Sequence, residues 1–206
     1  MYSRNPAECD YTPDTPLTRR ANEIAAVAHD TTGALYGRTD YIQHPRMVAE
    51  LLKVAGYGEV PQAVGLLHDT IEDTPETEDS LLFRLLEEIE TLEIPEERLF
   101  IANSIIVVRA VDALSNRSGD SRQEKIKRVA ANPLAGVVKS QGDAESHLEY
   151  NRWKLEEGIR RINSVLPRLR RYTRVQQELE DVQMTPAEME DYLEAQRAKL
   201  GWTATI

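Results

Sequence analysis

Residues 61–74 read PQAVGLLHDTIEDT, and this stretch decides the fold and indicates the chemistry. Its first half is apolar on nearly every side of a helix, which is typical of a helix buried in a core. Four ionisable side chains follow within six residues: His68, Asp69, Glu72 and Asp73. This ending is unusual, because unpaired carboxylates at the edge of a core repel one another and lose their hydration.

Helical geometry predicts where these four side chains point. At about 100° per residue, His68 lies over Glu72 and Asp69 over Asp73, so all four project within a sector of about 140°. We therefore expect them to converge on one site. A divalent cation would compensate the three carboxylates, and imidazole and carboxylate ligands suit Mn²⁺, Fe²⁺ or Zn²⁺. The alternative is a polar helix end in which His68 is a hydrogen-bonded core histidine.

Apolar residues recur at helical spacing along the rest of the chain, so the sequence predicts an all-α fold without a strand pair. Thr15 and Pro16 predict the cap and first turn of a long helix whose apolar positions extend to Leu35. Pro45 and Pro61 are predicted to open the next two helices. Further helices are predicted at residues 78–92, 96–115, 121–131 and 134–147, from Leu148 to a kink or end at Pro167, and from Thr185 to Gly201.

Composition limits the kind of partner. The chain has 206 residues, of which 41% are hydrophobic and 29% charged, and this is ordinary for a folded globular protein. A formal net charge of −10 opposes a broad phosphate-binding surface, so we expect no polymeric nucleic-acid partner. A small phosphorylated ligand remains possible where cations gather in one pocket.

The expected cellular location follows from the cysteine content and from the lengths of the apolar stretches in the sequence. Cys9 is the single cysteine, so an intrachain disulfide and a multi-cysteine zinc site are excluded. No apolar stretch has the length of a signal-peptide core or a membrane span. We therefore expect a cytoplasmic protein without a membrane partner.

A second segment supports the metal interpretation. Tyr41-Ile42-Gln43-His44-Pro45 places a histidine at a helix start 24 positions before His68. An antiparallel helix pair would bring the two histidines together.

These two segments resemble the HD-superfamily hydrolase domain of Rel/SpoT proteins, and the match to small stand-alone alarmone hydrolases is close. The resemblance covers residues 20–170. It implies an HD-domain helical bundle over residues 15–171, preceded by a polar lead-in at 1–14 and followed by a C-terminal helical appendage at 172–206.

The resemblance also implies an activity. His44, His68 and Asp69 correspond to the ligands of one metal, usually Mn²⁺, and Glu72 and Asp73 to the catalytic pair that serves the attacking water. The implied reaction removes the 3′-pyrophosphate from the small-molecule nucleotide guanosine tetra- or pentaphosphate. The alternatives are an HD hydrolase acting on another nucleotide, and a non-catalytic HD module that binds a nucleotide or a protein partner.

The fourth ligand is where the sequence departs from the family pattern, which reads V-K-x-x-D with an Asn four residues later. Here Asp143 comes one residue late, and His147 stands at the Asn spacing. Residues 130–135 resemble the stretch that leads into this helix, which favours Asp143 over Asp112 or Asp120. We predict that Asp143 is the fourth ligand and that a local bulge or shifted helix start at Gly142 absorbs the extra residue.

Arg38, His29 and the basic stretch at residues 160–174 are further candidates for contact with a substrate or a metal. Arg38 lies in a loop that resembles the nucleotide-contacting region of the family, so it is predicted to bind substrate. His29 stands where the family often has a histidine, but a structural histidine explains it equally well, and it stays outside the ligand set. The basic stretch at residues 160–174 is interpreted as a solvated helix face and is assigned no ligand.

Overall fold

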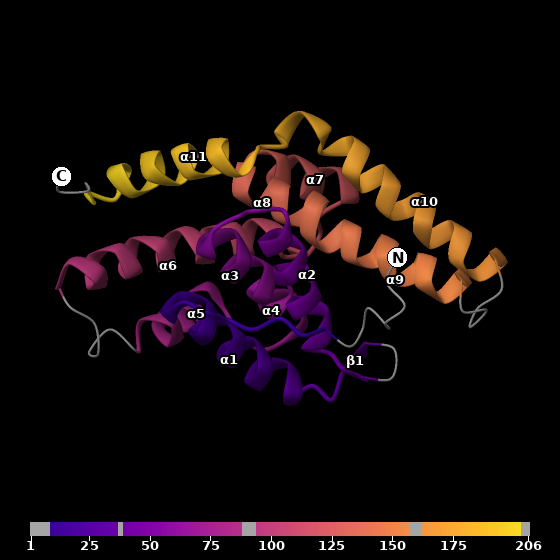
Figure 1. Cartoon of the computed structure of the whole chain (residues 1–206), viewed down its shortest axis with the longest axis horizontal. Coiled ribbons are helices and arrows are strands. Elements are labelled where there is room, and N and C mark those ends of the chain that lie inside the picture. The colour runs from indigo at the N-terminus through magenta and orange to yellow at the C-terminus, as the bar shows by residue number, and fades with distance from the viewer. Residues whose placement is uncertain (1–8, 37–38, 88–93, 157–161, 203–206) are drawn as a thin grey trace.

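The fold is all-α, as predicted, and Figure 1 shows the arrangement of its helices. The computed structural model describes residues 9–36, 39–87, 94–156 and 162–202. The helices are α1 (Pro16–Asp30), α2 (Gln43–Val54), α3 (Glu59–Leu67), α4 (Thr70–Asp73), α5 (Glu78–Leu86), α6 (Ile94–Leu114), α7 (Arg122–Ala130), α8 (Pro133–Val137), the π-helical η2 (Val138–Ala144), α9 (Glu145–Glu156), α10 (Ile162–Glu178), the short 3₁₀ turn η3 (Glu180–Val182) and α11 (Pro186–Lys199).

Side-chain caps explain where several helices begin. Thr15 accepts a hydrogen bond from the Thr18 amide and opens α1, as predicted, and Thr185 opens α11 in the same way. α2 and α3 begin two residues earlier than predicted, at Gln43 and Glu59. Pro45 and Pro61 therefore occupy the third helical position, where a missing backbone N–H still costs nothing because that group has no partner within the helix.

The chain after α1 differs from the prediction. α1 ends at Asp30, and Gly33 then adopts a φ of 63°, which a helix does not accommodate. Leu35 is 63% exposed and belongs to a short strand, β1 (Leu35–Tyr36), which pairs antiparallel with β2 (Thr39–Asp40). The helical apolar pattern therefore does not reach Leu35, and the expectation of no strand pair was wrong for this short hairpin.

α3 is the central helix of the core, as its apolar sequence predicts. It packs against α1, α2, α6, α8 and η2, so no side of it is left to solvent (Figure 1). Its residues from Val60 to Leu67 are buried. Burial on all sides fixes the position of the residues that follow α3, beginning with His68.

Two glycines let α2 lie unusually close to its neighbours. A Cβ on Gly65 of α3 would lie 3.1 Å from Val48 and Leu52 of α2, and a Cβ on Gly142 of η2 would lie 2.7 Å from the Cγ1 of Val48. Neither glycine has a positive φ. Gly142 is thus needed for close packing against α2, and not for the special backbone conformation that the sequence suggested.

The extra residue before Asp143 is absorbed by η2. Seven residues, Val138–Ala144, form a π-helix between α8 and α9. A π-helix closes i→i+5 hydrogen bonds, so it holds one more residue per turn than an α-helix and often results from a one-residue insertion near a functional site. The predicted local bulge is therefore confirmed, although it spans the whole segment around Gly142.

The C-terminal residues belong to the same core as the rest of the chain. α10 crosses the predicted boundary between residues 171 and 172 without a break, and Pro167 lies inside it. Val175, Leu179, Met189 and Leu193 are buried in the main hydrophobic cluster. Residues 172–202 therefore contribute apolar side chains to the main core. In the described ranges, no helix is both long and apolar enough to cross a bilayer.

Replacing Gly142 by alanine is expected to lower the free energy of unfolding by about 1 to 3 kcal/mol, the usual cost of overpacking. The new methyl group would press on the Cγ1 of Val48. Urea unfolding of Gly142→Ala, Val48→Ala and the double variant measures the coupling. The double variant should lose less than the sum of the two single losses, since truncating Val48 makes room. Additive losses would show that the contact with Val48 is not the constraint.

Candidate metal centre

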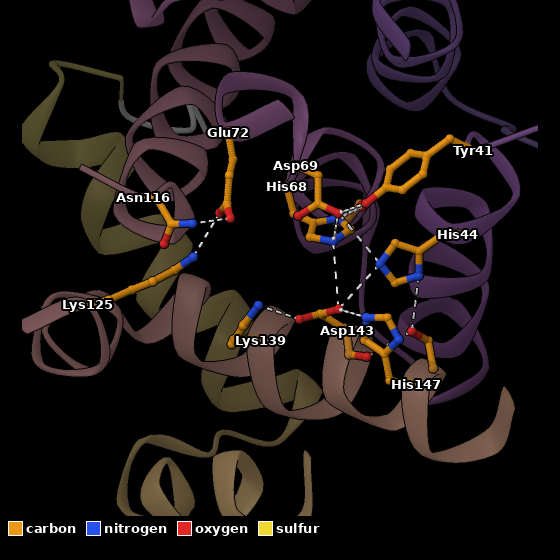
Figure 2. A network of polar contacts seen from close by, with 12 residues as sticks. Tyr41, His44, His68, Asp69, Glu72, Asn116, Lys125, Lys139, Asp143 and His147 are labelled. Carbon is orange, nitrogen blue, oxygen red and sulfur yellow. Dashed lines mark hydrogen bonds and ion pairs between the residues drawn. The ribbon is translucent and has the colours of Figure 1, made fainter. Parts of the chain in front are cut away.

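Four predicted site residues from three segments meet at one point in the structure (Figure 2). His44 comes from the first turn of α2, His68 and Asp69 from the junction between α3 and α4, and Asp143 from η2. His44, His68 and Asp143 are each buried, with 1 to 2% of their surface exposed. The structure therefore brings together all four residues predicted as metal ligands.

The spacing of the donor atoms suits a single metal ion. The Nε2 of His44 lies 3.6 Å from the Oδ2 of Asp69 and 3.4 Å from the Oδ1 of Asp143. The Nε2 of His68 lies 3.0 Å and 3.8 Å from the same two oxygens. Adjacent donors that bind one ion at about 2.1 Å lie about 3.0 to 3.4 Å apart, so the cluster matches or slightly exceeds this separation.

Hydrogen bonds fix the tautomer of His68. Its Nδ1 lies 2.8 Å from the carbonyl oxygen of Gly65, which only accepts, so Nδ1 carries a proton and donates it. Its Nε2 faces the cluster, is fully buried and has no hydrogen-bond partner among the described residues. A histidine anchored by one ring nitrogen to a backbone carbonyl and left with the other unpartnered is typical of a metal ligand.

His44 is oriented in a similar way. The hydroxyl of Ser146 donates its proton to the carbonyl oxygen of Asp143 at 2.8 Å, so its oxygen can accept from the Nδ1 of His44 at 3.4 Å. The Nε2 of His44 is then the nitrogen without a proton, and it faces both carboxylates. Both histidines thus turn Nε2 towards the same point, where each can offer a lone pair to a cation once that nitrogen is deprotonated.

The carboxylates have partners outside the cluster as well. The hydroxyl of Tyr41 donates to the Oδ2 of Asp69 at 2.6 Å. The ammonium group of Lys139 lies 2.5 Å from the Oδ2 of Asp143, which leaves Oδ1 directed at the histidines. Because Lys139 and Asp143 are four residues apart on η2, the π-helical turn places them on one face.

Protonation equilibria reflect this crowding. Burial opposes ionisation of both carboxyls, yet His68 holds the pKa of Asp69 well below its usual range, and Lys139 does the same for Asp143. Burial lowers the pKa of His68, but the Asp69 carboxylate outweighs it and raises that pKa to about 9. Burial lowers the pKa of His44 to about 4. The cluster thus attracts one positive charge, which a proton on His68 or a cation between the donors would supply.

Glu72 and Asp73 do not both reach this point. α3 ends at Leu67, residues 68–69 form a turn, and the angles of Asp69, φ −99° and ψ −2°, are distorted from ideal helical values, so regular helical spacing does not continue into α4. The carboxylate of Glu72 faces α7 instead, where it accepts hydrogen bonds from Lys125 at 2.8 Å and from Asn116 (Figure 2). The predicted convergence of all four side chains was therefore wrong for Glu72.

Asp73 lies nearer the cluster. Burial raises the pKa of its carboxyl, and the negative charges of Asp69 and Glu72 raise it further. A carboxyl with a raised pKa exchanges a proton closer to neutral pH than an ordinary aspartate does. The hydroxyl of Tyr41 lowers this pKa in part, so the same tyrosine serves both carboxyls.

The remaining candidate residues from the sequence do not join the cluster in the part of the chain that the structure describes. Arg38 lies outside the described residues. His29 is 2% exposed, both of its ring nitrogens lack a hydrogen-bond partner, and its ring lies 4.7 Å from that of Tyr41. It is a buried neutral histidine beside the cluster. Asp112 and Asp120 form ion pairs with Arg117 and Arg128 and take no part in the cluster.

Sequence reasoning missed two contributions. His147 was noted only at the family's Asn spacing, but its Nε2 lies 3.3 Å from the Oδ1 of Asp143. Its spacing of four residues from Asp143 was the available signal. The basic stretch also does more than face solvent: Arg168 and Arg171 line a cavity of about 450 Å³ together with Lys154. The rest of its wall is Leu35, Tyr36, His147, Tyr150, Asn151 and Tyr172.

A scan of protein-family models gives no match to this chain, and a search of curated proteins gives no significant relative. Functional proposals therefore rest on the motifs and on the geometry of the centre.

The burial of His29 predicts a pH dependence of stability. Burial lowers its pKa from 6.5 to about 4, so the unfolded chain binds the proton more tightly than the folded chain does. The stability associated with neutral His29 is present above pH 6.5 and is lost as the pH falls towards 4. With EDTA present, the unfolding free energy of the native protein should fall by about 2 kcal/mol more than that of His29→Gln between pH 7 and pH 5. Parallel pH profiles would show that His29 is protonated in the folded state.

Proposed function

We propose that this protein is a metal-dependent phosphohydrolase. The observation that carries the proposal is the buried Nε2 of His68, which has no hydrogen-bond partner among the described residues and faces Asp69, His44 and Asp143. A buried nitrogen beside two carboxylates needs a positive charge to complete the arrangement, and a divalent cation held by all four side chains would supply it. His44, His68, Asp69 and Asp143 would hold Mn²⁺, Fe²⁺ or Zn²⁺.

When bound by these four residues, a divalent cation would supply Lewis-acid chemistry: it would polarise a phosphoryl oxygen and lower the pKa of water. Tyr41 holds Asp69 through Oδ2, the same oxygen that faces the histidines. Lys139 holds Asp143 through Oδ2 and leaves its Oδ1 facing them. Asp73, with its raised pKa, is assigned to orient the attacking water and accept its proton. Glu72 would act with it once its side chain turns away from Lys125 and Asn116. The water oxygen bonds to phosphorus, the bond from phosphorus to the ester oxygen breaks, and the proton passes to that leaving oxygen.

The cavity beside His147 supports a phosphorylated nucleotide as the substrate. Lys154, Arg168 and Arg171 supply positive charge in a protein whose net charge is −10, and three tyrosine rings supply surfaces on which a base can stack. Tyr36 lines this cavity and also stacks on His44, with ring centroids 4.9 Å apart. A nucleotide in the cavity would thus lie next to the metal centre.

The resemblance to the Rel/SpoT hydrolase domain makes the proposal more specific. By that resemblance, the substrate is guanosine tetra- or pentaphosphate. Water would cleave the bond between the ribose 3′ oxygen and phosphorus, giving pyrophosphate and GDP or GTP. Purified protein with Mn²⁺ tests this through a screen of nucleotides in which pyrophosphate and the remaining nucleotide are both quantified.

One observation favours a second candidate, a non-catalytic HD module that binds a nucleotide. Glu72 is engaged by Lys125 and Asn116 on the side away from Asp69. A carboxylate held by two partners is less free to turn towards a water at the metal centre. The two candidates differ in whether any nucleotide is turned over.

The purified protein is expected to contain about one divalent metal per chain, and Asp143→Asn should lower its metal affinity strongly. The reason is that an amide keeps the shape of the side chain but lacks the negative charge. Elemental analysis and metal titration measure this, with Asp120→Asn as a matched control that removes a carboxylate paired with Arg128. Equal affinity in both variants would contradict the ligand assignment of Asp143.

Glu72→Gln is expected to keep its fold and metal but to lose turnover by a factor of about 10² to 10⁴, the usual cost of removing a general base. Initial rates at saturating substrate measure the loss. Glu96→Gln, at an exposed position in the first turn of α6, controls for the loss of one negative charge. Unchanged turnover in Glu72→Gln would leave Glu72 as a structural partner of Lys125.

A further inference from the structure

We propose that His147 is a fifth protein ligand of the metal, so that the centre consists of three imidazoles and two carboxylates. This inference rests on the proposed function, since it requires the cluster to hold a metal. It goes beyond the resemblance, because the family pattern has an Asn at this position.

The donor atom of His147 lies close to those of two of the other ligands, His44 and Asp143. Its Nε2 is 3.3 Å from the Oδ1 of Asp143, and its ring centroid is 4.6 Å from that of His44. Donor atoms of His44, Asp143 and His147 all lie within 4.8 Å of one another. A second group, His44, His68 and Asp69, meets the same criterion and shares His44. Figure 2 shows the His147 ring turned towards Asp143 and lying below His44.

The contacts around Asp143 are better explained by a shared ion than by hydrogen bonds. Three imidazole nitrogens surround its Oδ1, at 3.4 Å for His44, 3.8 Å for His68 and 3.3 Å for His147. Hydrogen bonds from nitrogen to oxygen are usually about 2.7 to 3.2 Å long. All three distances are longer, so none of the histidines is closely bonded to this oxygen, and the space between them suits a cation.

His147 is held in this orientation from its outer side. Its ring stacks on Tyr172 of α10, with centroids 4.2 Å apart and planes inclined by 17°. It follows Asp143 by four residues, just after η2 gives way to α9, so both side chains face α2. A ligand whose ring is packed before binding loses little conformational freedom when the metal arrives.

A third imidazole has a consequence for the choice of metal. Nitrogen donors favour the later divalent metals, and affinities follow Mn²⁺ < Fe²⁺ < Co²⁺ and reach higher values still for Zn²⁺. Exchanging His147 for the oxygen donor of an Asn should therefore weaken Zn²⁺ binding more than Mn²⁺ binding. This chain should prefer Fe²⁺ or Zn²⁺ over Mn²⁺ more strongly than a centre with two histidines does.

The test measures dissociation constants for Zn²⁺ and for Mn²⁺ by chelator competition in the native protein and in His147→Asn. We expect the ratio of the two constants to shift towards Mn²⁺ by a factor on the order of ten. The visible absorption of the Co²⁺-loaded protein should change as well, because it reports the number of nitrogen donors. His147→Gln is a second variant in case His147→Asn folds poorly, and His29→Gln controls for removal of a nearby buried histidine.

The possible results distinguish the assignment of His147 as a fifth ligand from the existence of the metal centre itself. Unchanged constants and an unchanged Co²⁺ spectrum in both folded His147 variants would overturn the fifth ligand, and loss of metal in His68→Ala would still uphold the centre. Metal retention in His68→Ala would overturn the centre itself. A shift in KM with neither metal constant altered would also refute the fifth ligand and would place His147 in the substrate cavity.

Discussion

The structure depends on keeping two carboxylates, Asp69 and Asp143, side by side at the edge of a core. Burial and mutual repulsion both oppose their ionisation, and Lys139, Tyr41 and the histidines offset this cost. Apart from His68, which directly precedes Asp69, these partners come from other segments, so the core must hold α2, η2 and the residues before α2 in register with Asp69. The small separations at Gly65 and Gly142 are what permit this, because they set α3 and η2 against the same face of α2.

Much of the fold was predictable because its signals are local. The capping threonines at 15 and 185 and the apolar run of α3 each specify structure within a few residues. The features of the fold that were not predicted depend on tertiary packing or on irregular backbone. The hairpin at Leu35 follows a glycine turn that interrupts an apparently helical pattern, and the membership of α10 and α11 in the core depends on packing against distant segments.

For the candidate site as well, residues in local motifs were predicted correctly, and residues that depend on tertiary structure were not. His44, His68, Asp69 and Asp143 were found from motifs and their spacing, and they meet in the structure. Glu72 was misplaced because the helix breaks at Asp69, and a fixed rotation per residue holds only within one helix. The ring partner of His147, Tyr172, lies 25 positions further on, and no local pattern connects the two residues.

The π-helical turn has a consequence for how such a site changes over evolution. An inserted residue normally rotates everything after it, and here it would have turned Asp143 away from the histidines. By widening one turn, η2 confines the disturbance to seven residues, and α9 continues in phase with its neighbours. A one-residue change in length thus becomes tolerable within this segment, and the helices packed around it need not be rearranged.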